Sequence, residues 1–532
     1  MQARVPTRSE RLAALGTRPF DLLVIGGGIT GCGIAYEAAS RGLAVALVEK
    51  ADFAWGTSSR SSRLVHGGVR YLEHGHIHLV FESSAERRSL LRLAPHLVRP
   101  LEFTWPVYEG SRISRWKLGA GLFAYDALSL FRNVARHRRL SHDTVLEREP
   151  ALRPAGLQGG ASYFDAATDD ARLTLANAVG ALEAGAVVVN HAGVAELIIE
   201  GGRAAGAMID DDLGSGRMAV RARCIVNATG PWSDELRALD DGGPAGVRGS
   251  KGAHIAVPRA RLGNRNAVTM ISPTDGRVLF ALPSGAFAIV GTTETEARRG
   301  PDDVRASRDD VRYLLDAANW FFPTAALHDA DVVSTWAGIR PLVADDATSP
   351  GALSREHAIH SSAHGIISIT GGKLTTYRVM ARDVLDAAFG GRASRRGSRP
   401  LPGGDFASLP DLVGRIAETT GDAALAEHLA ASFGTRWEAV WSEMGGDTNR
   451  VVDGLPYTYG ELRCCARSEM AETLGDLLIR RTHLAFETRD HGMAAAPSVA
   501  SAVAQTLGWN ANDVSRALAD YEHEVQRIFS VD

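Results

Sequence analysis

The sequence predicts an α/β protein with α+β insertions and a helical C-terminal domain, and three observations support this. A short apolar strand, a glycine-rich turn and a helix follow one another within Asp21–Glu49. Residues 250–345 alternate between apolar and polar positions, as antiparallel strands do. Beyond residue 405, apolar residues recur at helical spacings. A chain of 532 residues is long enough for two or three domains.

The composition is that of a soluble globular protein and limits the possible partners. With 45% hydrophobic residues, 23% charged residues and a net charge of −4, the chain gives no reason to expect nucleic acid as a partner. Its four cysteines have no C-x-x-C spacing, so we expect no metal site, no disulfide framework and a reducing cytoplasm. No apolar run reaches the ~20 residues of a membrane span. Residues 1–18 resemble a loose N-terminal extension.

The first strand, turn and helix have the order of a dinucleotide site. Leu22–Ile25 is the strand, and Gly26, Gly28 and Gly31 form G-x-G-x-x-G after it. The first glycine allows the tight turn, the second lets the backbone approach a pyrophosphate, and the third lets the helix pack on the strand. Glu49 ends the next strand, where it can accept hydrogen bonds from ribose hydroxyls. The acidic residue favours FAD or NAD over NADP. The motif alone does not distinguish FAD from NAD.

A later feature favours FAD over NAD. Val194–Glu200, Ala204–Ile209 and Met218–Ala222 predict a meander of short strands separated by glycine-rich turns. The meander leads into a strand at Cys224–Ala228 and a turn at Ala228–Gly230. Flavoproteins with a two-dinucleotide-binding fold close the adenine half of FAD with such a strand and turn. Simple NAD dehydrogenases rarely interrupt their sheet in this way.

Residues 57–73 and several later segments carry a more specific resemblance. They resemble the FAD-dependent glycerol-3-phosphate dehydrogenases, the quinone-linked enzymes of aerobic glycerol metabolism. The matching segments, in chain order, are Asn227–Trp232, Lys251–His254, Gly291–Glu294, Gly338–Leu342 and Gly371–Arg378, with weaker matches at Leu401–Gly404 and Asp476–Thr482. The resemblance therefore runs through about residues 20–380 and becomes weaker beyond.

This resemblance implies a fold and a domain organisation. It implies a Rossmann-like FAD-binding domain of the amino-acid-oxidase-like superfamily, interleaved over residues 19–390 with an antiparallel-sheet substrate domain. Residues 75–160 and 245–345 would form most of the substrate domain. Residues 391–404 read as a linker by composition, and residues 405–532 as a helical cap without chemistry of its own.

The resemblance also implies a reaction. It is the oxidation of sn-glycerol 3-phosphate to dihydroxyacetone phosphate, by hydride transfer from C2 to N5 of FAD, with electrons passed to a membrane quinone. The main alternative is a glycerol-3-phosphate oxidase, which uses oxygen and makes hydrogen peroxide. An amino-acid oxidase and a nucleotide-binding protein without catalysis are more distant alternatives, because neither needs several cations near the flavin.

Arginine and lysine at matched positions would bind the substrate phosphate, because arginine holds phosphate oxygens in pairs. Histidine has a suitable pKa to take the hydroxyl proton. The alternative is that neighbouring cations lower the pKa of the alcohol enough for water to take the proton. The expected catalytic residues are His66, His254, Arg340 and Lys373. The expected substrate-binding residues are Arg70, Tyr71, Arg355 and Tyr377, the last by its helical spacing from Lys373.

The cofactor contacts come from the glycine turn and the matched segments, and no metal is expected. They are Gly26, Gly28, Gly31, Glu49, Thr57, Ser58, Ser59, Ser62, Arg63, Leu64, His66, Gly67, Gly68, Ala228, Thr229, Gly230, Trp232, Gly338, Gly372, Lys373, Leu374 and Thr375.

Ser111–Arg139 has basic residues on both sides of an apolar, aromatic middle, as interfacial segments do. A core helix with solvated ends has the same composition. The resemblance favours the interfacial interpretation, because it implies a cytoplasmic protein attached peripherally to an anionic membrane surface, where it meets quinone. A homo-oligomer is also compatible with the sequence.

Overall fold

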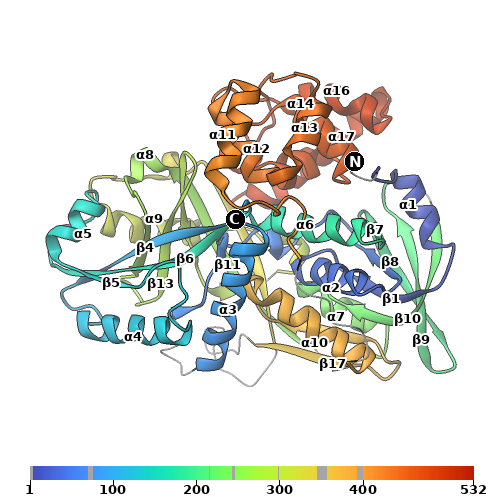
Figure 1. Ribbon diagram of the computed structural model, residues 1–532, viewed down its shortest axis with the longest axis horizontal. Coiled ribbons are helices and arrows are strands. Elements are labelled where there is room, and N and C mark those ends of the chain that lie inside the picture. The colour runs from blue at the N-terminus through green and yellow to red at the C-terminus, as the bar shows by residue number, and fades with distance from the viewer. Residues whose placement is uncertain are drawn as a thin grey trace.

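The computed structural model describes residues 4–69, 76–214, 216–242, 246–297, 299–343, 356–391 and 399–532. Two sheets and a helical domain make up the molecule (Figure 1). The nucleotide-binding sheet lies on the right of this view, a larger sheet on the left, and the helical C-terminal domain above both. None of the described helices combines the length and the apolar character that crossing a bilayer requires.

The nucleotide-binding sheet is mainly parallel, and its strands come from distant parts of the chain. Its order is β17-β18-β10-β1-β2-β7, with β8 and β9 added beside β10 as the expected meander. The bounds are β1 Phe20–Ile25, β2 Val45–Val48, β7 Val187–Val189, β8 Ala192–Glu200, β9 Arg203–Asp211, β10 Arg217–Asn227, β17 His357–Ser361 and β18 Ile367–Gly371. Strands β1 and β2 are almost wholly buried, as the continuous apolar runs of a parallel sheet require.

Three helices pack against one another beside this sheet: α2 (Ile29–Ser40), α6 (Asp170–Glu183) and α10 (Tyr377–Phe389). Helix α2 contacts both of the others, and its apolar side chains join the core formed with β1 and β2. This packing sets the start of α2 at the carboxyl ends of the parallel strands.

The larger sheet has the order β15-β11-β14-β13-β12-β4-β6-β3, with β16 beside β11 and β5 beside β6. Most of its strands come from the two segments expected in the substrate domain, whereas β3 and most of β6 lie outside them. Their bounds are β3 Leu64–Val65, β4 Val98–Tyr108, β5 Arg138–Leu140, β6 Leu157–Thr168, β11 Val247–Pro258, β12 Ala267–Ile271, β13 Val278–Ser284, β14 Phe287–Gly291, β15 Thr295–Glu296 and β16 Ser334–Val343. All of its pairings are antiparallel except that of β12 with β4.

Helices cover the edges and faces of the larger sheet. Helix α3 (Ile77–Leu93) and helix α4 (Arg115–Leu128) contact each other at its lower side in Figure 1. The other helices of this half are α5 (His142–Arg148), α8 (Arg259–Leu262) and α9 (Arg308–Phe321).

The C-terminal domain is helical, as expected. It contains α11 Leu409–Thr420, α12 Ala423–Phe433, α13 Trp437–Met444, α14 Tyr459–Ser468, the π-helix η9 Asp476–Arg481, α15 Leu484–Glu487, α16 Ala496–Leu507 and α17 Ala511–Phe529. Tyr521, Val525 and Ile528 of the last helix are buried in the domain core, so the predicted apolar stripe is packing.

The N-terminal segment is not the loose extension that the sequence suggested. Helix α1 (Arg8–Leu15) begins with a capping box between Thr7 and Glu10. Arg11 is 3% exposed and forms an ion pair with Glu472 of the C-terminal domain at 2.7 Å. These long-range contacts give no signal in the local sequence.

Candidate active site

Two adjoining cavities lie along the carboxyl ends of the parallel strands. The first, which we call the nucleotide cavity, has a volume of about 410 Å³ and is lined by Gly26, Gly28 and Glu49. The second, the inner cavity, has a volume of about 270 Å³ and reaches the larger sheet. The two share seven lining residues: Ile29, Thr57, Ser58, Pro341, Gly372, Lys373 and Leu374. An elongated ligand can therefore extend from one cavity into the other.

The glycine turn has the geometry that the sequence predicted. Gly26 has a φ of +108°, and a Cβ atom there would lie 2.6 Å from the carbonyl oxygen of Ala228. A Cβ atom on Gly31 would lie 1.8 Å from the carbonyl oxygen of Gly26. Helix α2 begins after Gly28 without a side-chain cap. The turn thus leaves the positive end of the helix dipole facing the nucleotide cavity, where a pyrophosphate fits.

Glu49 is held by backbone donors at the edge of the nucleotide cavity. Its Oε2 atom accepts from the backbone N–H of Gly27 at 2.5 Å, and Oε1 accepts from that of Ala51 at 2.9 Å. Burial raises the pKa of this carboxyl, and the two N–H donors oppose that shift. The predicted turn Ala228–Gly230 and Trp232 line the same cavity. Together these residues fit the adenosine and pyrophosphate of FAD.

The loop after Glu49 forms one wall of the inner cavity. Thr57 donates from Oγ1 to the carbonyl oxygen of Ile339 on β16 at 2.6 Å. The backbone of His66 exchanges two hydrogen bonds with Oγ1 of Thr375, at 3.1 and 3.2 Å. Ser62, Leu64, His66 and Gly68 line the cavity, with Gly338 on the facing strand.

His254 lies in the wall of the inner cavity and is deeply buried. Its Nε2 atom is 2.8 Å from Oγ of Ser62, and its ring stacks on Trp336 with centroids 5.3 Å apart. Burial, with the positive charges of Arg340 and Arg63, lowers the pKa of His254 to about 3. The imidazole is therefore neutral near pH 7 and a weak base until negative charge enters the cavity.

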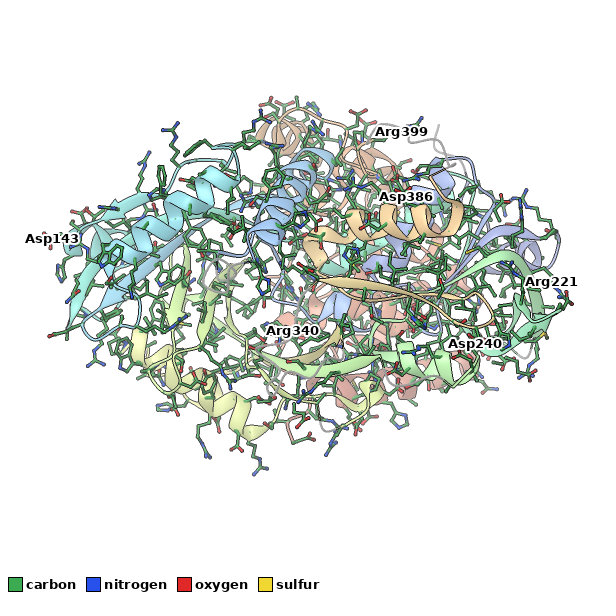
Figure 2. All side chains as sticks on the ribbon, turned by 90° about the horizontal axis from the view of Figure 1, so that it is seen from below. Asp143, Arg221, Asp240, Arg340, Asp386 and Arg399 are labelled. Carbon is green, nitrogen blue, oxygen red and sulfur yellow. The ribbon has the colours of Figure 1, made fainter. Side chains whose placement is uncertain are left out.

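Two cations of the predicted set reach the inner cavity. Lys373 lies at the start of the short helix η7 (Leu374–Thr376), lines both cavities, and donates from Nζ to Oγ of Ser83 at 3.5 Å. Arg340 projects from β16, in the middle of the molecule (Figure 2), and donates to Oγ1 of Thr292 at 3.2 Å. Both side chains are half-buried, which strengthens their attraction for an anion.

Several predicted contacts lie behind the cavity walls. Tyr377 is buried in the core against Gly33 and lines neither cavity, so its expected substrate contact does not fit this structure. Arg63 is directed toward the C-terminal domain, with its guanidinium 4.9 Å from the ring centroid of Phe486. The remaining predicted cofactor residues outside both linings are Gly31, Ser59, Gly67 and Thr375. Arg70, Tyr71 and Arg355 lie outside the described residues.

The structure adds site residues that the sequence did not single out. Asp165 lines the inner cavity and accepts from the N–H of Gly67 at 3.0 Å and from the hydroxyl of Tyr125 at 2.6 Å. It also forms a buried ion pair with Arg87 of α3. Arg60 also belongs to this lining, but its buried guanidinium is directed toward Trp55 and donates to the carbonyl oxygen of that residue at 3.2 Å. An aromatic wall completes the cavity and comprises Phe103, Trp105, Tyr163 and Phe280.

A Rossmann-type glycine turn that leads into a cation-lined cavity under an antiparallel sheet defines a flavin-dependent oxidoreductase. Comparison with known proteins agrees with this class. The family model of FAD-dependent oxidoreductases matches residues 21–378, and that of the C-terminal domain of alpha-glycerophosphate oxidase matches residues 395–514.

Curated relatives and a solved structure narrow the family. Glycerol-3-phosphate dehydrogenase 2 of Mycobacterium tuberculosis is 38% identical, over 96% of this chain and 89% of that protein. The aerobic glycerol-3-phosphate dehydrogenase of Bacillus subtilis is 35% identical, over 90% of each chain. The FAD complex of the Bacillus halodurans glycerol-3-phosphate dehydrogenase has a TM-score of 0.83 at 32% identity, covering 99% of this chain and 100% of that one. The chain therefore belongs to the glycerol-3-phosphate dehydrogenase family of FAD-dependent oxidoreductases.

Proposed function

We propose that this protein oxidises sn-glycerol 3-phosphate to dihydroxyacetone phosphate at the inner cavity and passes the electrons to a membrane quinone. The observation that carries the proposal is the position of Lys373, which lines both cavities, together with Arg340 in the lining of the inner cavity. A cavity with several cations suits a small dianionic substrate. The names of the relatives support the same substrate.

The residues of the inner cavity would bind the substrate and move its proton. FAD, when bound, supplies the hydride acceptor. Lys373 and Arg340 would hold the phosphate and stabilise negative charge on the substrate oxygen. His66 and His254 are the candidates to accept the hydroxyl proton. Because the pKa of His254 is low, a bound dianion must raise that pKa before His254 can accept the hydroxyl proton.

An anaerobic titration with glycerol 3-phosphate tests this function. The flavin absorption of the purified protein should bleach with glycerol 3-phosphate and not with glycerol or amino acids. Recovery on addition of a soluble quinone would support the dehydrogenase. Recovery with oxygen alone, accompanied by hydrogen peroxide, would support glycerol-3-phosphate oxidase instead. Flavin that never bleaches would contradict the proposed substrate.

We expect His254 to make the protein less stable in mild acid. Its folded pKa of about 3 lies below its ordinary value of 6.5, so the unfolded chain takes up a proton first. Stability from this residue is therefore complete above pH 6.5 and is lost as the pH falls toward 3. The free energy of unfolding, measured with denaturant, should fall between pH 7.5 and pH 5. This fall should be about 2 kcal/mol larger in the parent than in His254→Gln. The exposed His523→Gln serves as control, and equal losses in both variants would contradict the expectation.

The surface around α4 supports contact with a membrane. Leu118, Leu122 and Tyr125 of this helix pack inward, whereas Trp116 is 67% exposed and Phe123 is 57% exposed. Further exposed apolar side chains surround them: Ile77, Phe81, Leu130, Phe131 and Val134. Arg115 and Lys117 are exposed beside this apolar surface. We propose that Ser111–Arg139 lies on an anionic membrane, which would bring the protein to quinone.

Charge reversal tests this contact. Arg115→Glu combined with Lys117→Glu should weaken binding to phosphatidylglycerol vesicles in co-sedimentation by about 30-fold or more at low salt, since each basic residue contributes about 1 kcal/mol. Turnover with a soluble dye acceptor should be unchanged. The matched control reverses two exposed arginines on other elements, Arg223→Glu with Arg516→Glu. Equal loss in both pairs would reflect net charge alone and contradict a specific surface.

A further inference from the structure

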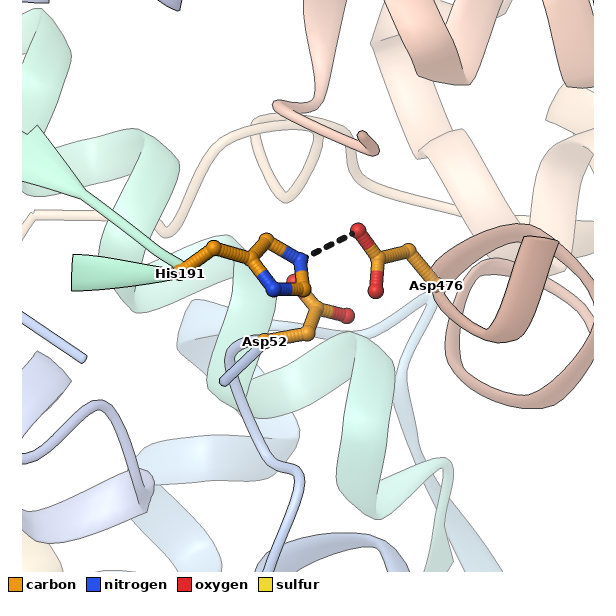
Figure 3. A group of neighbouring side chains, drawn as sticks. All are labelled: Asp52, His191 and Asp476. Carbon is orange, nitrogen blue, oxygen red and sulfur yellow. Dashed lines mark hydrogen bonds and ion pairs between the residues drawn. The ribbon is translucent and has the colours of Figure 1, made fainter. Parts of the chain in front are cut away.

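Asp52, His191 and Asp476 form a buried cluster where the nucleotide-binding sheet meets the C-terminal domain (Figure 3). Oxygen and nitrogen atoms from these three side chains lie within 4.8 Å of one another, a spacing that can hold a metal ion. Arginine side chains already bind both carboxylates, Arg480 on Asp476 at 2.9 Å and Arg481 on Asp52 at 2.6 Å. Because these guanidinium groups supply the positive charge, we interpret the cluster as an ion-pair network.

Asp52 is the centre of this network. It is fully buried and accepts from Nε of Arg480 at 2.7 Å and from both terminal nitrogens of Arg481 at 2.6 and 2.9 Å. Asn190 adds a fourth donor at 3.1 Å. Two arginines of the C-terminal domain thus bind one carboxylate of the nucleotide-binding domain. Removing one partner of such a buried pair leaves an uncompensated charge.

Both arginines belong to the π-helix η9 and bind the same carboxylate. Arg480 and Arg481 are adjacent in η9, and both are 2% exposed. Arg480 also binds Glu524 of α17 at 2.7 Å, and Arg481 donates to the carbonyl oxygen of Glu469. The arginine pair is therefore fixed within its own domain.

Asp52 ends the segment that carries Glu49. The carbonyl oxygen of Ala51 accepts from the N–H of His191 at 2.6 Å, and that of Glu49 accepts from the N–H of Ala192 at 2.7 Å. The side chain of His191 pairs with Asp476 at 2.9 Å, and this pairing outweighs burial and raises the histidine pKa. Residues 49–52 are thus held between the β7–β8 connection and η9. The N–H of Ala51, which binds Glu49, belongs to the same held segment.

We propose that Arg480 and Arg481 are positioning residues for FAD: by holding Asp52, the C-terminal domain fixes Glu49 for the ribose of the adenosine half. No residue of the described 399–532 part lines either cavity, so the effect passes through Asp52. The inference rests on the FAD-dependent function proposed above and assigns a cofactor role to a domain that contacts no substrate.

The test compares FAD with FMN, which lacks the adenosine half. Full-length apoprotein of Arg481→Met should bind FAD about tenfold more weakly than the parent, by fluorescence titration, and release it faster. Its affinity for FMN should be unchanged, because Glu49 faces only the adenosine ribose. Arg481→Lys, which keeps one charged donor, should restore part of the FAD affinity.

A second ion pair between the domains provides the matched control. Arg172 of α6 binds the side chain of Glu469 in the C-terminal domain at 2.7 Å, and this pair is equally buried. Arg481 contacts Glu469 through the backbone carbonyl oxygen, which Arg172→Met leaves in place. Arg172→Met should lower thermal stability without changing the ratio of FAD to FMN affinity. The inference is overturned if Arg481→Met leaves FAD affinity intact, or if it weakens FMN equally. If Arg481→Met does not fold, the ratio of FAD affinity to FMN affinity is measured in Arg481→Lys, and an unchanged ratio overturns the inference. A parent protein that binds no FAD would instead refute the proposed function.

Discussion

Lys373→Ala is expected to lower kcat/KM for glycerol 3-phosphate by about 10²–10³-fold, the usual effect of removing one charge-stabilising donor. Lys373 lines both cavities, and in the proposed function the reacting part of the substrate meets the flavin there. FAD should remain bound, because the glycine turn and Glu49 are untouched. Steady-state kinetics with a dye acceptor, together with the flavin-to-protein absorbance ratio, measure both effects.

Lys251→Ala is the control for this substitution. Its ammonium group pairs with Asp310 at 2.6 Å and lies outside the lining of the inner cavity. We expect kcat/KM to change by less than about threefold in this variant, a difference of well under 1 kcal/mol. A similar loss in the two variants, or none in Lys373→Ala, would remove Lys373 from the reacting centre.

Gly31→Ala is expected to yield a colourless, destabilised protein. The added Cβ atom would lie 1.8 Å from the carbonyl oxygen of Gly26, and both partners belong to the backbone of the turn. The turn must therefore open, which costs about 3 kcal/mol or more and displaces the backbone that approaches the pyrophosphate. The absorbance ratio at 450 and 280 nm and the midpoint of thermal unfolding measure these losses.

Gly414→Ala is the control for glycine replacement. Gly414 lies inside α11, and a Cβ atom there would meet nothing within 4 Å. Alanine should stabilise that helix by about 0.5–1 kcal/mol and leave FAD bound. Retention of FAD by Gly31→Ala at the parent level would show that the turn tolerates a side chain, contrary to the geometry.

The nucleotide site was predictable because its signals are local. The glycine turn and Glu49 lie within one strand–helix–strand unit, and each residue type has a single physical reason to be there. The resemblance to a family then placed Arg340 and Lys373, and both line the inner cavity. Spacing alone does not distinguish these two from other surface cations.

Tyr377 shows where spacing misleads. The sequence predicted that Tyr377 lies on the same helical face as Lys373, which precedes it by four residues. The structure inserts the 3₁₀-helix Leu374–Thr376 between them, so Lys373 lies before the α-helix and the two side chains diverge. Helical periodicity relates side chains only within one continuous helix.

The support of the His66 loop was not predictable for a different reason. Asp165, Tyr125 and Arg87 come from β6, α4 and α3, and they meet only when the larger sheet and its helices pack together. None of the three stands in a recognisable local pattern. Arg480 and Arg481 lie in the weakly matching segment Asp476–Thr482, but no local signal shows that they reach Asp52 across more than 400 positions of sequence.

The strand order of the nucleotide-binding sheet has a consequence for biosynthesis. Leu23 on β1 pairs with Ile225 on β10, and Val226 on β10 pairs with Ile367 on β18. A ribosome therefore releases the first strand with only β2 as an early partner, long before β10 exists. One edge of this apolar strand must stay open until the middle of the polypeptide emerges, which exposes it to chaperones and to aggregation. Because Ala228 and Gly371 also line the nucleotide cavity, that cavity is complete only after most of the chain has been made.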